Sequence, residues 1–311
     1  MKARILSLVA LVCSVSFLMV SCQKDSNNNN NTDYTAETAT HSDDDSRFSS
    51  ESDAAANDIN AQLEITPGFS GRGGQVQSII CDATIAIDTV SNPRTITITF
   101  NGTQCLPGRT RTGVIVISMA QGVRWKNPGA ALNVTFQNFK ITRTIDNKSI
   151  TFNGTQTYTN VSGGLLINLP MLNTITHTIT SSNMSITFDN NAQRNWQVAR
   201  QRVFTYNNGI VISVTGMHSE GGITGIAEWG TNRFGNAFTT RIANPIIARQ
   251  DCSFRVGSGK LTHTTPNFTA SATFGLDAQG NPTSCPGTGN YYMKIEWTGP
   301  NNVTHTTILP Y

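Results

Sequence analysis

The sequence predicts an all-β fold, built as a long antiparallel meander that forms a sandwich or an incomplete barrel. In residues 94–100, Ile96, Ile98 and Phe100 alternate with threonines, the period-two pattern of a sheet with one buried face. Asn101-Gly102 follows, one of many turn signals that separate such segments. After residue 66, no segment keeps helical spacing for more than about two turns, which excludes alternating strand–helix folds.

The chain divides into three parts. Residues 1–21 read as a signal peptide, residues 22–66 as a lipidated cysteine with an acidic, disordered tether, and residues 67–311 as one all-β domain. The tether includes Asn27 to Asn31 and has little apolar content. One short helix is expected within it at residues 52–63, where apolar side chains recur at helical spacing.

The N-terminal segment has the features of an export signal. Lys2 and Arg4 precede an apolar run at residues 5–20, and Ser21 stands before Cys22. The ending Leu-Met-Val-Ser-Cys resembles the lipobox of bacterial lipoproteins. The resemblance implies that the Cys22 thiol receives a diacylglycerol and that Cys22 becomes the first residue of the mature chain. Acyl chains anchor a protein to a membrane without any transmembrane segment.

The residues after Cys22 bear on sorting. Gln23 replaces the aspartate that marks inner-membrane retention in some bacterial lipoproteins, so the resemblance implies sorting to the outer membrane. Lys24-Asp25-Ser26 is similar to the charged export tag of Bacteroidota surface lipoproteins. We therefore expect a lipid-anchored outer-membrane protein, and the tag favours exposure at the cell surface.

Charge is distributed unevenly along the mature chain. Residues 23–66 carry ten acidic and two basic residues, whereas residues 67–311 carry nine acidic and eighteen basic residues. The simplest interpretation is that the acidic run is solvated. The alternatives are that the two blocks fold back on each other, or that they orient the domain at an anionic surface.

Four cysteines remain after Cys13 in the signal and Cys22 at the anchor are set aside. An even number in an exported chain points to disulfides, and four cysteines allow three connectivities. No two of them have the close spacing of a zinc site, and we predict no metal. Because terminal strands have a neighbour on one side only and fray, we predict bonds within each end of the sheet, Cys81 to Cys105 and Cys252 to Cys285.

Several turn motifs together resemble a family of Bacteroidota lipoproteins with a lipobox, an acidic tether and a β-rich body. They include Arg109 to Gly113 entering an apolar strand, the Asn127-Pro128-Gly129 turn, Thr224 to Gly230, and the final cysteine turn before residues 291–297. The family carries no assigned activity. The resemblance therefore implies localisation and fold, and nothing about chemistry.

Catalytic patterns are weak in this sequence, and we predict no catalytic residues and no cofactor. The five histidines lack ligand spacing; His218-Ser219-Glu220 is the most enzyme-like cluster but has no nucleophile elbow. Glu220, Glu228 and Glu296 cannot be placed as a hydrolytic pair. Residues 277–281 match a calcium loop only loosely, and a plain turn is the simpler interpretation.

The best candidate for a binding site is a strip on one strand. Trp196, Arg200 and Arg202 share one face of residues 196–206, and arginine beside an aromatic ring suits anionic sugars or phosphates. Trp125 belongs to a second aromatic and basic cluster. If these side chains point outward, replacing both arginines should leave the melting temperature nearly unchanged. The alternative is a core stripe with the arginines at the sheet margin.

The function expected from these observations is a binding or envelope-structural role, as in adhesion or in glycan or anion capture. The expected partners are the membrane, through the lipid anchor, and an acidic polysaccharide or envelope protein. Nucleic acid is excluded as a partner by the exported, tethered context. The alternatives are a hydrolase that uses loop carboxylates and an envelope carrier that holds an acyl chain between sheet and lid.

Overall fold

The computed structural model describes residues 34–71, 80–105, 108–181, 183–285, 290–298 and 302–311. The predicted signal peptide, Cys22 and the first part of the predicted tether lie outside these ranges. Asp33–Tyr311 form one compact unit. The elements within it are α1 (Thr35–Ile65), α2 (Pro67–Ser70), β1 (Ala83–Asp88), β2 (Arg94–Asn101), β3 (Arg109–Met119), β4 (Ala130–Arg143), β5 (Ser149–Asn160), η1 (Leu166–Asn168), α3 (Leu169–Leu172), β6 (Thr174–Ser181), β7 (Ser185–Phe188), β8 (Gln193–Tyr206), β9 (Ile210–Gly216), β10 (His218–Glu220), β11 (Ile223–Thr231), β12 (Ala237–Arg249), η2 (Gln250–Cys252), β13 (Val256–Thr264), β14 (Thr269–Leu276), β15 (Tyr292–Thr298) and β16 (Thr304–Pro310).

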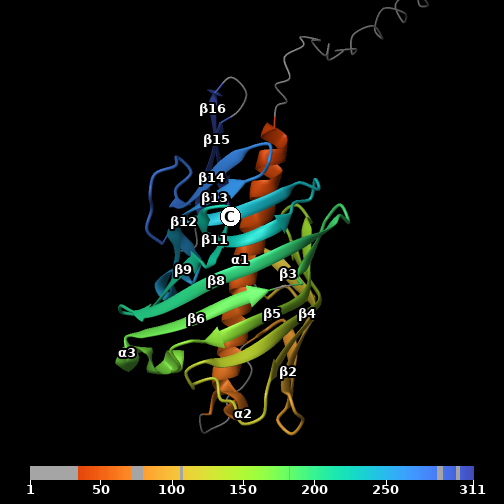
Figure 1. Cartoon of the computed structure of the whole chain (residues 1–311), viewed down its shortest axis with the longest axis vertical. Coiled ribbons are helices and arrows are strands. Elements are labelled where there is room, and N and C mark those ends of the chain that lie inside the picture. Colours follow the sequence, from red (N-terminus) through yellow and green to blue (C-terminus); the bar gives the residue numbers. More distant parts are fainter. Residues whose placement is uncertain (1–33, 72–79, 106–107, 182, 286–289, 299–301) are drawn as a thin grey trace, which may run out of the picture. The chain divides into compact units, whose positions relative to one another are not determined.

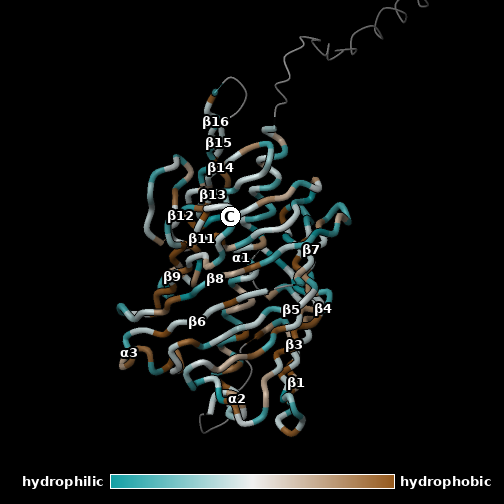
Figure 2. The backbone as a smooth tube through the Cα atoms, in the orientation of Figure 1, coloured by the Kyte–Doolittle hydropathy of each residue, from teal (hydrophilic) through white to brown (hydrophobic). Residues whose placement is uncertain are grey.

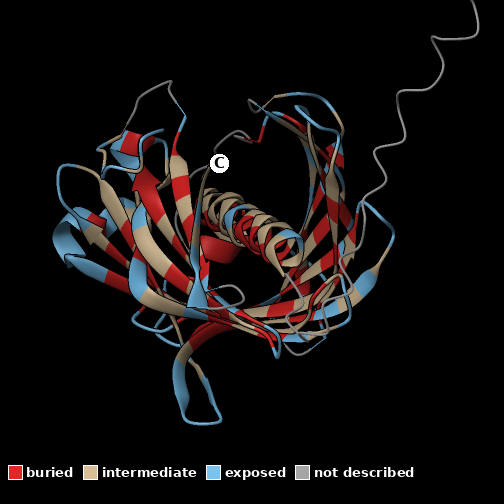
Figure 3. Ribbon diagram, turned by 90° about the horizontal axis from the view of Figure 1, so that it is seen from above, coloured by how far each residue is buried: buried red, intermediate tan, exposed pale blue. Residues whose placement is uncertain are grey.

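The predicted all-β meander is confirmed. In the described part of the chain, sixteen strands form a single antiparallel sheet in which most strands pair with their sequence neighbours. The strand path begins at β1 and ends at β16, and the sheet curves around α1, which runs along its concave side (Figures 1 and 3). The architecture is an incomplete barrel filled by a helix.

The strand patterns follow the predicted alternation. Ile96, Ile98 and Phe100 are buried toward the concave side, and apolar and polar residues alternate along many strands (Figure 2). The register of β4 against β5 shifts between Phe136 and Phe139, as a bulge at this place requires. Gly113 of β3 lies opposite that bulge, where any Cβ would collide with the backbone of residue 138, so only glycine fits.

The segment expected to be a tether is, from residue 35 on, a helix of 31 residues. The prediction of disorder with one short helix is therefore wrong for this stretch. The reason is that the helix needs little apolar surface, because its small residues allow close packing and its acids meet arginines of the sheet. Phe48, Ile59 and Leu63 supply its main apolar contacts and are fully buried.

The hydrophobic core has two halves that use α1 differently. Phe48, Ile59 and Leu63 join one cluster with side chains of the first half of the sheet. The second cluster lies on the second half of the sheet and contains no buried residue of α1. The apolar face of the helix therefore packs on the first half of the sheet, while its serines face the second half.

The four cysteines of the body pair as predicted. Cys81–Cys105 joins the entry of β1 to the end of β2, with Cα atoms 5.9 Å apart. Cys252–Cys285 joins η2 to the loop between β14 and β15, with Cα atoms 5.1 Å apart. Each bond lies within one end of the sheet, where the terminal strands have a neighbour on one side only.

Replacing both Cys252 and Cys285 with serine should lower the free energy of unfolding by about 3 kcal/mol, since the bond closes a loop with a sequence separation of 33. Denaturant titration of the variant against the wild-type chain measures the difference. A reducing agent should lower the stability of the wild-type protein through loss of this bond. In the variant, which already lacks the bond, it should cause no further loss from this position. An unchanged unfolding midpoint in the variant would contradict a stabilising role.

Among the described residues, no helix is both long and apolar enough to cross a membrane.

Candidate functional site

The predicted binding strip lies inside the molecule. Trp196, Arg200 and Arg202 of β8 are 0, 3 and 2 % exposed, and Trp125 is 1 % exposed. These side chains face α1, which contradicts the outward-facing alternative and agrees with the alternative of a core stripe. Glu228 of the sheet and Asp53 of α1 compensate the buried charge of Arg200, and Asn57 of α1 accepts a hydrogen bond from Arg202.

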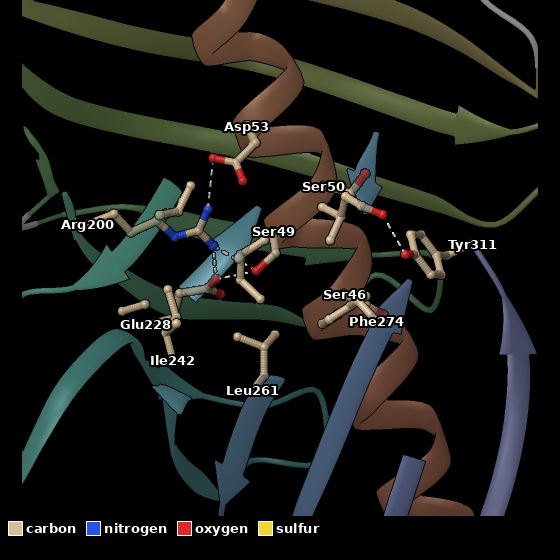
Figure 4. A pocket seen from close by; sticks show the side chains of 14 residues that line it. Ser46, Ser49, Ser50, Asp53, Arg200, Glu228, Ile242, Leu261, Phe274 and Tyr311 are labelled. Carbon is tan, nitrogen blue, oxygen red and sulfur yellow. Dashed lines mark hydrogen bonds and ion pairs between the residues drawn. The ribbon is translucent and has the colours of Figure 1, made fainter. Parts of the chain in front are cut away.

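Arg200 is the centre of a buried ion-pair cluster (Figure 4). Its Nη2 contacts Glu228 Oε1 of β11 and donates to Ser49 Oγ at 2.7 Å, and its Nη1 lies 3.3 Å from Asp53 Oδ1. Trp196 Nε1 donates to the other oxygen of Glu228 at 2.7 Å. The strand arginine, the strand carboxylate and the helix are thus held together by charge-assisted hydrogen bonds.

Arg202 has a thinner set of partners. Its Nη2 donates to Asn57 Oδ1 of α1 at 2.5 Å, and its guanidinium lies 5.2 Å from the Phe204 ring centroid. Burial lowers the pKa of Arg202, and the carboxylate of Asp53 opposes this effect. Nearby, Trp125 Nε1 donates to Asn60 Oδ1 of α1 at 3.1 Å. Trp125 and Arg202 therefore position the helix.

Ion pairs continue along the whole of α1. Arg111 of β3 binds Asp82 through two hydrogen bonds of 2.8 and 2.6 Å and also reaches Asp58 of α1 at 2.6 Å. Further pairs between α1 and the sheet side join Asp43 to Arg143, Asp44 to Arg233, and Glu51 to Arg109. The acidic and basic blocks of the sequence fold back on each other, so the solvated interpretation of the acidic run is wrong for residues 35–65.

A second polar centre lies close to Glu228. Asp45 of α1, Thr240 of β12 and His263 of β13 are each fully buried. Thr240 Oγ1 donates to Asp45 Oδ1 at 2.8 Å and lies 3.1 Å from His263 Nδ1, which is 3.3 Å from Asp45 Oδ2. Three reactive groups therefore meet within hydrogen-bonding distance. The aromatic ring of His41 packs against His263, with centroids 5.6 Å apart.

Burial controls the protonation of these groups. It raises the pKa of Asp45 to about 7, and burial followed by the charge of Asp45 raises the pKa of Glu228 to about 7. Burial likewise raises the pKa of Asp44 to about 6. For the imidazoles burial acts in the opposite direction, and it lowers the pKa of His263 to about 4.

A small cavity separates the serine face of α1 from the second half of the sheet. Its volume is about 30 Å³, which is room for about one or two water molecules. Ser46, Ser49, Asp53, Arg200 and Glu228 line its polar side, and apolar side chains of the sheet line the other (Figure 4). The cavity does not accommodate a substrate or an acyl chain.

The surface candidates for chemistry stay apart from this interior. His218 Nε2 lies 3.6 Å from Glu220 Oε2, with side-chain exposures of 33 and 64 %, and the His218 ring stacks on Trp229. Asp277 accepts hydrogen bonds from the backbone N–H groups of residues 279 and 281, the arrangement of a plain turn. Within the described ranges, the groups of metal-ligand type are the two disulfide pairs beside Asp82 and Asp251, whose sulfurs are already bonded.

Comparison with protein-family models, with curated proteins and with solved structures finds no match to this chain.

Sequence reasoning missed the partners that α1 supplies. Glu37, Asp44, Glu51 and Asp58 recur at intervals of seven residues, which keeps them near one line along a helix. The last three meet arginines of the sheet side, and Glu37 accepts a hydrogen bond from Asn236. This spacing, together with the opposite charge of the body, is the signal that could have placed the helix against the sheet.

The buried groups predict an unusual dependence of stability on pH. The raised pKa values of Glu228 and Asp44, about 7 and about 6, mean that stability is lost as pH rises from about 4 through about 7. The lowered pKa values of His41, His177 and His263, about 3, about 3 and about 4, mean that stability is lost as pH falls below about 6.5. Three imidazoles outweigh two carboxyls below about pH 6, so the unfolding midpoint in urea should be highest between about pH 6 and 7.

The acidic groups can be separated from the histidines by one variant. Glu228→Gln should reduce the loss of stability on the alkaline side and leave the loss on the acidic side, because the amide does not titrate. Urea titrations at several pH values measure both limbs. A wild-type midpoint that rises steadily from pH 6 to pH 8 would contradict the assignment of buried neutral carboxyls.

Proposed function

We propose that this protein is a lipid-anchored outer-membrane lipoprotein with an envelope-structural role. Cys22 carries the anchor, and α1 transmits its attachment into a rigid β body. The observation that carries the proposal is the seating of α1, whose acids form ion pairs with the sheet side from Asp43 to Asp58. A segment close to the anchor is thereby built into the core.

The burial of the predicted strip argues against the other functions considered. Trp196, Arg200 and Arg202 are too buried to capture an acidic polysaccharide, so they do not support glycan binding. Glu228 and Asp45 interact with each other, but both are fully buried, and the cavity that Glu228 lines has a volume of only about 30 Å³. That cavity is too small for the cargo of a lipid carrier, and the hollow of about 270 Å³ lined by Gly71, Lys126, Leu165, Ile167 and Asn168 is below the roughly 300 to 1,000 Å³ of ligand pockets.

The anchor is tested by Cys22→Ser. Labelled palmitate should enter the wild-type protein and should not enter the variant, because the serine hydroxyl is not a substrate for thiol lipidation. Membrane fractionation should find the wild-type chain with the outer membrane and the variant in the soluble fraction. Equal labelling of the two proteins would remove the lipoprotein proposal.

The structural role is tested in cells that lack the protein. Loss of the chain should sensitise the envelope to detergent, and expression of the wild-type chain should restore resistance. The Cys22→Ser chain, which keeps the β body but lacks the proposed anchor, should fail to restore it. Restoration by the unanchored variant would show that attachment is not part of the role.

A further inference from the structure

The contact between Asp45, Thr240 and His263 brings a carboxyl group, a hydroxyl group and a base together in a dry site. The Thr240 hydroxyl lies 2.8 Å from one Asp45 oxygen, and His263 Nδ1 lies 3.1 Å from the hydroxyl and 3.3 Å from the other Asp45 oxygen. One nitrogen can thus take a proton from the hydroxyl and deliver it to the carboxyl. We infer that Thr240 and Asp45 condense into an intramolecular ester that ties α1 to β12.

The reaction balances without any co-reactant. Thr240 Oγ1 attacks Cγ of the neutral Asp45 carboxylic acid, and His263 Nδ1 accepts the proton that Oγ1 gives up. The Cγ–Oδ2 bond breaks, and Oδ2 leaves as water with its own proton and the proton returned by His263. The products are one ester bond and one water molecule, and the His263 imidazole is again neutral.

The charges around the site favour each step. Burial raises the pKa of Asp45 to about 7, so the acid is available in its neutral form, and burial lowers the pKa of His263 to about 4, so the base is free. The positive charge of Arg200 partly opposes the effect of burial on the Asp45 pKa, and the same charge favours the negative charge that develops on the Asp45 carboxyl during the attack. Proximity replaces the activation that condensation in water would need.

The surroundings also disfavour the reverse reaction. All three residues are fully buried, and the His41 ring that packs on His263 lies 5.0 and 6.3 Å from the rings of Phe238 and Phe268. The nearby cavity of about 30 Å³, lined by Ser46 and Glu228, can take the released water, and Asp45, Thr240 and His263 do not line it. The ester carbonyl is therefore not exposed to this cavity, so the released water is not held against it for hydrolysis.

The inference is independent of the proposed function. It concerns how α1 is held in the body and does not depend on whether Cys22 is lipidated. The bond would join residues 195 positions apart in the sequence. Removal of the helix from the sheet would then require breaking a covalent bond as well as ion pairs.

The test is mass spectrometry of peptides from the full-length, folded chain, reduced, alkylated and digested with trypsin at neutral pH. Cleavage after Lys24 and Arg47 gives residues 25–47, and cleavage after Arg233 and Arg241 gives residues 234–241. We expect most of the wild-type chain to yield these two peptides as one linked species, lighter than their sum by one water. Hydroxylamine should separate them and leave a hydroxamate on Asp45.

Variants assign the link to its atoms. Thr240→Val removes the hydroxyl at nearly constant shape and should abolish the linked species, whereas Thr239→Val, the matched control in the same peptide, should keep it. His263→Phe should abolish or greatly slow its formation. A succinimide at Asp45-Ser46 also loses water, but it lies within one peptide and joins nothing.

Two results would overturn the inference. The first is recovery of residues 25–47 and 234–241 from the wild-type chain as separate linear peptides at their sequence masses, even after prolonged incubation of the folded protein. The second is a linked species that survives in Thr240→Val. Melting curves of each variant show whether the fold is retained, and the wild-type measurement decides the matter even if a variant fails to fold.

Discussion

A chain that begins at Pro67 and therefore lacks α1 should fail to form a stable β domain. The helix supplies Phe48, Ile59 and Leu63 to the core and the carboxylates that neutralise buried arginines of the sheet. Without it, the concave face would expose aromatic and aliphatic side chains to water and leave Arg200 and Arg202 beside apolar neighbours. We expect aggregation on expression, or a product without a cooperative unfolding transition.

The missing helix can be returned as a peptide. Residues 34–66 added during refolding of the truncated chain should restore strand circular dichroism and a cooperative transition. A matched peptide with Asp53→Lys and Asp58→Lys should fail, because it places cations against Arg200 and Arg111. A truncated chain that unfolds cooperatively at the wild-type midpoint without any peptide would contradict this account of the core.

Arg200→Met should lower the free energy of unfolding by about 3 to 5 kcal/mol. Methionine replaces the aliphatic part of the arginine side chain but leaves the Glu228 carboxyl buried with no cation in contact. Removal of one partner from a buried ion pair lowers the stability by an amount of this size. Urea titration near pH 8, above the Glu228 pKa of about 7, gives the difference. This expectation reverses the one drawn from the sequence, in which the arginines of β8 could be replaced without a change in melting temperature.

Two further variants test the cause. Arg249→Met removes an arginine whose pair with Asp251 is about half exposed and screened by solvent, and it should leave the unfolding midpoint nearly unchanged. The double variant Arg200→Met with Glu228→Gln should recover part of the loss, because no charged carboxylate is then left unpaired at residue 228. Equal effects of Arg200→Met and Arg249→Met would show that burial of the pair is not what matters.

The sheet could be predicted from the sequence because strand signals are local. The alternation in residues 94–100 and the even cysteine count each depend on neighbouring residues or on simple counting, and the structure confirms both. The curvature of the sheet and its wrapping around a helix depend on contacts between distant parts of the chain. No window of residues contains that information.

The helix and the interior of the candidate site were hidden for a different reason. Helix prediction relies on an apolar stripe, but α1 buries Thr38, Ser42, Asp44 and Ser52 as well as its few large apolar side chains. Many polar residues of α1 form hydrogen bonds and ion pairs with the sheet instead of facing solvent. Arg200 and Trp196 were correctly assigned to one strand face, but the direction of that face depends on partners in α1 such as Asp53, which lies 147 positions from Arg200 in the sequence.

The place of α1 in the chain has a consequence for how the protein matures. Of the elements that the structure describes, α1 is synthesised first, yet it bonds to residues of the β11–β12 region that follow it by 179 to 199 positions. Such distant pairings are slow to form, because a long loop must close before any contact rewards it. If the chain is exported as proposed, α1 leaves the export channel before the strands that it contacts. Before those strands are present, the polar surface of α1 exposes few apolar side chains, so α1 has little tendency to aggregate. Folding would then end when the sheet closes around α1. An interruption before β12 has emerged would leave α1 without its contacts to the β11–β12 region.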